Sequence, residues 1–145
     1  MKRILLLAVL LISGFSSAAN IKSDAYLLGL VGQKINEIED VSYSYKTPTK
    51  IYYFSPTVST GFELQLNKDT AEVVWLFGRK DKLAENKKAE ATAIAFTQKL
   101  LGQQAMDLLI KPMKAGKTVK TIKINGVTIN NARCSSIQCM YSVVR

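Results

Sequence analysis

The chain of 145 residues contains no histidine, only two cysteines and a single tryptophan. The missing imidazole removes the side chain that most often acts as a general base near neutral pH, and also a common metal ligand. A cysteine nucleophile would lack its usual basic partner for the same reason. Two thiols alone do not supply the four ligands that a structural zinc site needs. We therefore expect no metal and no cofactor, and we expect the protein not to be an enzyme.

Motifs of catalytic sites are also missing from the sequence. No Gly-x-Ser-x-Gly elbow occurs, and no glycine-rich phosphate loop follows a predicted strand. Paired carboxylates are the remaining route to hydrolysis, and Glu37, Glu39 and Asp40 lie together at the end of a predicted helix. A small hydrolase that uses Glu37 and Asp40 is one hypothesis, although a solvated helix end explains the same residues.

Long apolar runs are confined to the start of the chain. Lys2 and Arg3 precede an apolar run from Ile4 to Ile12, and small residues follow up to Ala19. This order is typical of a cleaved secretory signal peptide, and the run is too short for a bilayer, which takes about 20 residues. We predict cleavage after Ala19, with Ala18 as the alternative, rather than an uncleaved membrane anchor. No cysteine lies near this site, so we expect a periplasmic or secreted protein without a lipid anchor.

The two cysteines, Cys134 and Cys139, are separated by four residues. In an oxidising compartment two such thiols pair, whereas a redox motif more often has two intervening residues. We predict a structural disulfide between neighbouring strands, with residues 135–138 as the loop of a hairpin. Closing so short a loop should stabilise the fold by on the order of 2 kcal/mol.

Charge is distributed unevenly along the chain. The formal net charge is +9, and loss of Lys2 and Arg3 with the signal peptide leaves +7. Acidic and basic residues balance in 20–107, so residues 108–145, which contain no acid, carry the excess. The basic residues of this part are Lys111, Lys114, Lys117, Lys120, Lys123, Arg133 and Arg145. Such asymmetry favours an anionic partner, although lysines also protect strand edges and keep proteins soluble.

Hydrophobic periodicity in the first half predicts a helix followed by strands. Ser23-Asp24 is a typical helix start, and apolar residues at helical spacing continue to Ile38, with Gly29 and Gly32 dividing the helix into two pieces. Period two begins with Val41, Tyr43 and Tyr45 and predicts strands through 51–54 and 62–66. A central strand is predicted over 73–77, which is apolar on both faces.

The second half repeats this order of elements. An amphipathic helix is predicted over 83–101, and a shorter helix runs from about 106 to Pro112. Strands follow over 118–124, 127–134 and 140–144, with Asn125-Gly126 as a hairpin turn. The order α-βββ-α-βββ predicts a single α+β domain over 20–145, with helices packed on one face of an antiparallel sheet.

Aromatic residues form a second candidate surface. The set comprises Tyr43, Tyr45, Tyr52, Tyr53, Phe54 and Trp75. The strand over 51–54 is apolar on both faces, so one face becomes a candidate for binding if it is wet. Packing in the core is the simpler explanation for most of these residues.

We therefore predict a binding protein that docks on another envelope protein with an acidic surface, as an inhibitor, an immunity factor or an accessory subunit. The candidate binding residues are Lys111, Lys114, Lys117, Lys120, Lys123, Arg133, Tyr52 and Tyr53. An anionic glycan or lipid surface is the alternative partner, and a carboxylate-based hydrolase is the second alternative. Nucleic acid is the weakest expectation, because no motif for it is present.

Overall fold

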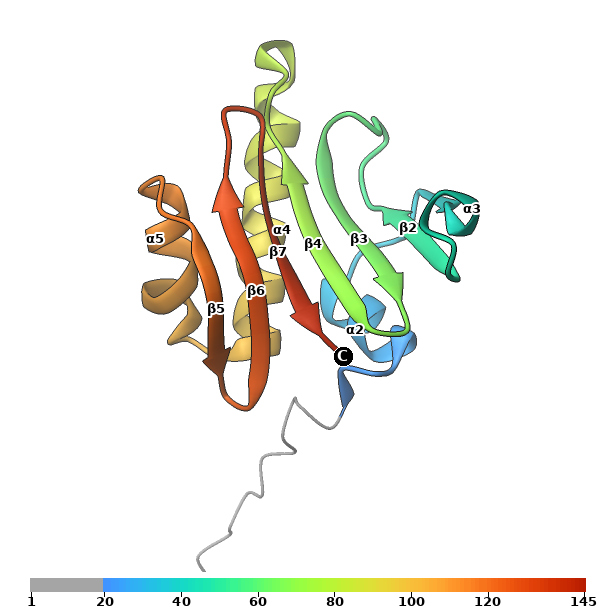
Figure 1. The fold of residues 1–145 in the computed structure, drawn as a ribbon. Coiled ribbons are helices and arrows are strands. Elements are labelled where there is room, and N and C mark those ends of the chain that lie inside the picture. Colours follow the sequence, from blue (N-terminus) through green and yellow to red (C-terminus); the bar gives the residue numbers. More distant parts are fainter. Residues whose placement is uncertain (1–19) are drawn as a thin grey trace, which may run out of the picture.

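The computed structural model describes residues 20–145 (Figure 1), and the predicted signal peptide over 1–19 lies outside them. The first described helix, α2, spans Asp24–Val31. Ser23 caps this helix as predicted, since its hydroxyl accepts a hydrogen bond from the Tyr26 amide at 3.2 Å. Gly32 ends it with a left-handed φ of 66°. No helix among residues 20–145 is long and apolar enough to cross a membrane.

Strand β1 spans Glu37–Asp40 and forms one edge of the sheet. The sequence predicts helix up to Ile38, and this part of the prediction is wrong. All four residues are exposed, so β1 lacks the apolar face that would identify it as a strand. Its place is set by pairing with β2, Thr49–Tyr53, in which Glu37 lies opposite Tyr53.

The residues between β1 and β2 form a single helical turn, α3, over Ser42–Tyr45. Their alternating pattern predicts extended structure, which is wrong here. The Asp40 carboxylate accepts a hydrogen bond from the Ser42 amide at 2.9 Å, and this local contact favours a turn. Lys46 then ends the turn with a left-handed φ of 54°. The side chain of Tyr43 consequently points into solvent and is 97% exposed.

The centre of the sheet consists of β3, Gly61–Asn67, and β4, Thr70–Leu76. The predicted central position of the second of these strands is confirmed, because β4 pairs with β3 on one side and with β7 on the other. Alternate residues of the two strands face the helices and are buried: Phe62, Leu64, Leu66, Ala71, Val73 and Trp75.

The longest helix, α4, spans Leu83–Leu101 and has the bounds that the sequence predicts. It follows a 3-10 turn, η1, over Lys80–Lys82. Its apolar stripe packs against β3 and β4, and Phe96 contacts Phe62 with ring centroids 5.6 Å apart. Gly102 ends the helix with a φ of 86°.

A π-helical turn, η2, over Met106–Ile110 leads directly into α5, Lys111–Lys114. Pro112, which the sequence predicts as the end of this helix, lies instead in the first turn of α5. Lys111, the residue before it, donates its N–H to the Met106 carbonyl five residues back, which is the wider hydrogen bonding of the π-turn.

The last three strands are β5, Val119–Ile124, β6, Val127–Cys134, and β7, Gln138–Val144. Asn125 and Gly126 form the predicted hairpin turn, with φ values of 49° and 80°. The predicted disulfide is present between Cys134 and Cys139, which face each other across the hairpin of β6 and β7.

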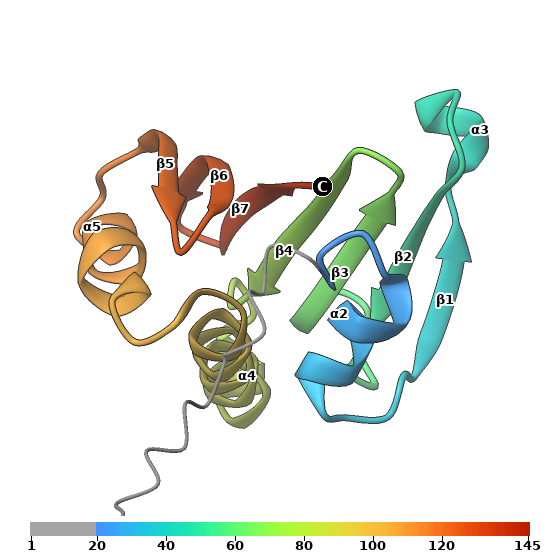
Figure 2. The ribbon, with the colours of Figure 1, turned by 90° about the horizontal axis from the view of Figure 1, so that it is seen from below.

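All seven strands form one antiparallel sheet in the order β1-β2-β3-β4-β7-β6-β5. The predicted α+β class is confirmed, with β1 as an additional strand. Figure 2 shows that the sheet curves around α2, α4 and α5, which lie on its concave side. We call the opposite, convex side the open face. By the register of the strands, the side chains of Tyr53, Glu63, Val74 and Met140 lie in one row across it.

Arg145 joins the end of β7 to the segment that precedes α2, and Figure 1 shows these two parts of the chain close together. Its guanidinium donates hydrogen bonds to the carbonyl oxygens of Ile21 and Lys22, at 2.9 and 2.7 Å. It also forms an ion pair with Asp24 at 2.5 Å. Because its side chain is only 3% exposed, Arg145 stabilises the fold and does not contribute to the basic surface.

Candidate functional site

The predicted basic residues separate into paired and unpaired groups. Lys111 and Lys114 lie on α5 and each contacts an acid, Asp107 in the first case and Glu90 in the second. Their charges are therefore largely compensated within the molecule. The second pair joins α5 to α4 at the rim of a pocket of about 300 Å³, next to Trp75 and the disulfide.

Four predicted cations remain exposed at the other edge of the sheet. Lys117 precedes β5, Lys120 and Lys123 lie on it, and Arg133 lies on β6. Among the described residues, no carboxylate lies within 4.0 Å of any of these four side chains. We call this set, Lys117, Lys120, Lys123 and Arg133, the basic edge.

The cations of the basic edge surround the outer strand. Lys123 pairs with Thr128 and faces the open side, whereas Lys120 is exposed beside the irregular pairing at Asn131, whose φ is 54°. Arg133 pairs with Met140 and also lies on the open face. Strand β5 pairs only with β6 in the described part of the chain. Its outer backbone N–H and C=O groups are thus available, with positive charge beside them.

The two predicted tyrosines do not join this surface. They lie on β2, at the far end of the strand order from β5, and point to opposite faces of the sheet. Tyr52 belongs to the core and is 8% exposed. The hydroxyl of Tyr53, on the open face, donates a hydrogen bond to the Glu39 carboxylate at 2.7 Å.

Acidic residues gather on the open face around Tyr53. Glu37 and Glu39 lie on β1, Glu63 on β3 and Glu72 on β4, all on the open side by register. We call this set, Glu37, Glu39, Glu63 and Glu72, the acidic end. Burial, together with the charges of Glu39 and Glu72, raises the pKa of Glu63 to about 7. Burial and the bond to Glu39 also raise the pKa of Tyr53.

The positions of these acids differ from the sequence prediction. Glu37, Glu39 and Asp40 lie on an edge strand and not at a helix end. Glu37 and Asp40 are three positions apart on a strand, so their side chains point to opposite faces of the sheet. Asp40 is also engaged with Ser42, whose hydrogen bonds lower the pKa of its carboxyl. The carboxylates of Glu37 and Asp40 therefore do not lie on either side of a common space that a substrate bond could occupy.

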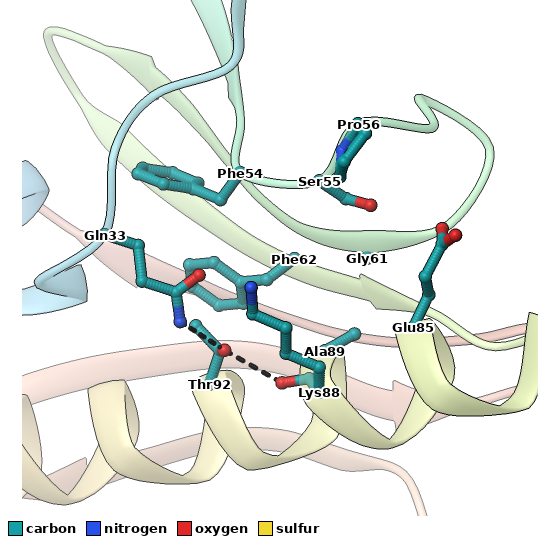
Figure 3. Close-up of a pocket in the computed structure, with 10 residues that line it drawn as sticks. All are labelled: Gln33, Phe54, Ser55, Pro56, Gly61, Phe62, Glu85, Lys88, Ala89 and Thr92. Atoms are coloured by element: carbon teal, nitrogen blue, oxygen red, sulfur yellow. Dashed lines mark hydrogen bonds between the residues drawn. The ribbon is translucent and has the colours of Figure 1, made fainter.

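A separate pocket of about 180 Å³ opens between α4, the loop after β2 and the segment after α2 (Figure 3). The rings of Phe54 and Phe62 form its apolar wall, with centroids 5.7 Å apart. Ala89 and Thr92 line the helix side. The sequence did not predict this pocket, because its lining comes from three distant segments.

Polar side chains surround the apolar wall of this pocket. Gln33 donates a hydrogen bond from Nε2 to Thr92 Oγ1 at 2.8 Å, which fixes the direction of its amide. Figure 3 shows Lys88 extending from α4 toward the same amide, while the Glu85 carboxylate lies at the other end of the pocket. No carboxylate of the described chain lies within 4.0 Å of the Lys88 ammonium.

Local backbone geometry shapes the upper wall of the pocket. Gly61 begins β3 with a φ of 97°, and a Cβ at this position would lie 2.2 Å from the Cβ of Ser55. Any larger residue at Gly61 would force Ser55 and the loop away. Across the pocket, Glu85 accepts a hydrogen bond from the Thr60 hydroxyl at 2.6 Å, which is the main cause of its lowered pKa.

Comparison with known proteins adds no assignment, since no family model, no curated protein and no solved structure matches the chain. Within residues 20–145, no group of three or more His, Cys, Asp or Glu side chains is placed to hold a metal ion. The geometry of the described residues offers two surfaces for binding, the basic edge and the pocket beside α4.

Proposed function

We propose that the protein is an exported binding protein that receives an acidic, extended segment of another envelope protein along the edge of β5. The observation that carries this proposal is the basic edge. Within residues 20–145, Lys117, Lys120, Lys123 and Arg133 are exposed, have no carboxylate within 4.0 Å and surround a strand that pairs on one side only. The other edge of the sheet carries the opposite charge.

The physical basis is strand addition. The outer N–H and C=O groups of an edge strand bind an extended peptide through main-chain hydrogen bonds, and the side chains supply selectivity. Lys123 and Arg133 would attract acids on the open face of the added strand. Positive charge also raises the rate of encounter with an acidic partner and repels a basic one.

The disulfide and the signal-like start of the sequence support the proposed export. The protein has a disulfide between Cys134 and Cys139, and disulfides are typical of proteins in oxidising compartments. Mass spectrometry of the protein purified from its native cells should give a chain that begins at Asn20 with both sulfurs oxidised. A chain that begins at Met1 with two free thiols would contradict export.

Binding is best tested with a synthetic peptide of alternating glutamate and threonine, because such a strand offers acids on one face and β-forming residues on the other. Nuclear magnetic resonance titration should shift the amides of β5 and β6, and affinity should fall steeply with salt. Charge reversal at Lys120→Glu and Lys123→Glu should weaken binding at least tenfold. The matched control reverses Lys80 and Lys87, which are exposed on η1 and α4.

The same titration separates this proposal from the main alternative. An anionic polysaccharide or vesicle would respond to the charges alone, without backbone hydrogen bonds at β5. Stronger binding to these polyanions than to the peptide, with no change at the β5 amides, would favour a glycan or lipid surface as the partner. Equal loss of binding in the control variant would show that only the net charge matters.

A further inference from the structure

The pocket beside α4 combines three features that point to a specific kind of small ligand. Its wall is aromatic, one end carries the Lys88 ammonium, which has no carboxylate partner in the described part of the chain, and the other end carries the Glu85 carboxylate. From this arrangement we infer that the pocket binds a free α-amino acid with an apolar side chain. This site is independent of the proposed function, because none of its residues belongs to the basic edge.

The size of the pocket suits the apolar part of such a ligand. Its volume of about 180 Å³ is comparable with that of cavities that admit a benzene ring, which measure about 150 Å³. Phe54 and Phe62 are almost fully buried, so the faces they present to the pocket are among their few contacts with solvent. An apolar side chain inserted there would cover these rings and gain contact with Ala89 on the helix.

The charged groups at the two ends determine the rest of the ligand. Lys88 and Glu85 lie three positions apart on α4 and therefore project from neighbouring positions on one face of the helix. An α-amino acid carries its carboxylate and its ammonium on one carbon, so the long, flexible Lys88 side chain would turn from its end of the pocket toward Glu85. Its ammonium would then bind the ligand's carboxylate, while Glu85 would bind the ligand's ammonium. A simple carboxylate would meet repulsion from Glu85, and a simple amine would meet repulsion from Lys88.

Glu85 keeps both its charge and its capacity to accept hydrogen bonds. Its pKa is lowered, chiefly by the hydrogen bond from Thr60, so the carboxylate is ionised at neutral pH. One oxygen accepts from Thr60 at 2.6 Å and the other lies 3.5 Å from the Lys82 ammonium. An ionised carboxylate has about four lone-pair positions, which leaves room for a ligand ammonium. The Ser55 hydroxyl lies on the same side of the pocket (Figure 3).

The neighbouring amide is held in place before any ligand binds. Thr92 accepts from Gln33 and donates to the Lys88 carbonyl at 2.8 Å, which joins the segment after α2 to α4. The Gln33 carbonyl oxygen is thereby turned toward the pocket, as Figure 3 shows. A ligand would therefore enter a largely formed site.

The test is a titration of the complete mature protein with three probes of nearly equal size: L-phenylalanine, 3-phenylpropionate, which lacks the ammonium, and 2-phenylethylamine, which lacks the carboxylate. L-Phenylalanine should bind saturably, with a Kd of roughly 0.1–10 mM for a ligand of this size. Chemical shift changes should centre on the amides of Phe54, Gly61 and Phe62. Each analogue should bind at least tenfold more weakly.

Variants identify the two charged contacts. Lys88→Met should weaken L-phenylalanine binding at least tenfold and leave the weak binding of 2-phenylethylamine equal or stronger. Glu85→Gln should also weaken L-phenylalanine binding at least tenfold. It should leave the weak binding of 3-phenylpropionate equal or stronger. Lys87→Met is the matched control, since Lys87 is exposed and does not line the pocket. Melting curves of all three variants establish that they remain folded.

Three results would overturn the inference. The first is an absence of saturable binding of L-phenylalanine and of L-leucine up to their solubility limits. The second is equal affinity for 3-phenylpropionate, which would leave Glu85 without a role. The third is an unchanged Kd in both the Lys88→Met and the Glu85→Gln variants. None of these results depends on whether an acidic peptide binds at β5, so the two proposals fail separately.

Discussion

The two ends of the sheet carry opposite charges, and they differ in how far these charges are exposed to solvent. At the basic edge, Lys117, Lys120 and Lys123 are exposed, and no acid of residues 20–145 forms an ion pair with them. At the acidic end, Glu63 is partly buried between like charges, and its pKa is raised to about 7. Exposed charges cost little free energy and remain available for a partner. Crowded, partly buried charges of one sign reduce stability.

The largest change in the free energy of unfolding is expected from a substitution at Glu63. Its pKa is raised from 4.5 to about 7, so between these values the folded state binds a proton that the unfolded state does not. Stability should therefore fall as pH rises from about 4.5 to 7 and level off above this range. Glu63→Gln should raise the free energy of unfolding at pH 8 by roughly 1–3 kcal/mol, measured by urea denaturation. Equal stabilisation at pH 4 would show that charge is not the cause.

The second expected effect isolates the neighbouring charge. Glu39→Lys replaces repulsion with attraction across the open face, so the pKa of Glu63 should fall by about one unit. Carboxyl chemical shifts followed against pH give this value directly. The matched control is Asp81→Lys, which makes the same charge change outside the sheet. A similar shift in the control would mean that net charge, and not the position of Glu39, controls Glu63.

A smaller effect is expected from the tyrosine on the open face. Tyr53→Phe removes the hydrogen bond to Glu39 at 2.7 Å and should cost about 1 kcal/mol in thermal or urea unfolding. Tyr45→Phe serves as the control, because its hydroxyl makes only a long contact of 3.4 Å with Gln65. If both variants lost the same stability, the Tyr53 hydroxyl would have no special role at the acidic end.

The smallest effect is expected where the charges are exposed. Reversal of Lys120 and Lys123 to glutamate should change the free energy of unfolding by no more than about 0.5 kcal/mol. Because the same reversal should abolish most binding of an acidic peptide, the variant separates folding from recognition. A loss of several kcal/mol would instead show that these lysines stabilise the edge of the sheet.

Local signals in the sequence account for most of the second half of the fold. The apolar stripe of α4 and the glycine after it predict its bounds at Leu83 and Leu101. The backbone preference of Asn125-Gly126 alone predicts a turn. The short spacing of the two cysteines predicts the disulfide between them. Each of these features depends on neighbouring residues, which is why sequence reasoning finds them.

Most of the errors lie in the first half, because long-range pairing decides its structure. Strand β1 has four exposed residues and becomes a strand only through its register with β2. In α3, a hydrogen bond from Ser42 to Asp40 prevails over an alternating pattern. A charged strand without an apolar face shows no hydrophobic alternation, so its sequence does not indicate a strand.

The candidate site was predictable only in part. Composition identifies the basic segment, but it does not reveal that Lys111 and Lys114 are paired with Asp107 and Glu90. The acidic end brings Glu39 next to Glu63, residues far apart in the chain. The pocket likewise requires the approach of Gln33, Phe62 and Lys88 from separate segments. Such neighbours are known only once the sheet order is known.

The bonds of Arg145 to the backbone of Ile21 and Lys22 place the beginning and the end of the domain side by side. A short glycine-rich linker from Arg145 to Asn20 should therefore permit a circular permutant that opens in the exposed loop at Gly116. Such a rearranged chain would free β5 from the covalent link to α5, and it would offer a new terminus beside the basic edge for attaching a fluorophore or a tethered peptide.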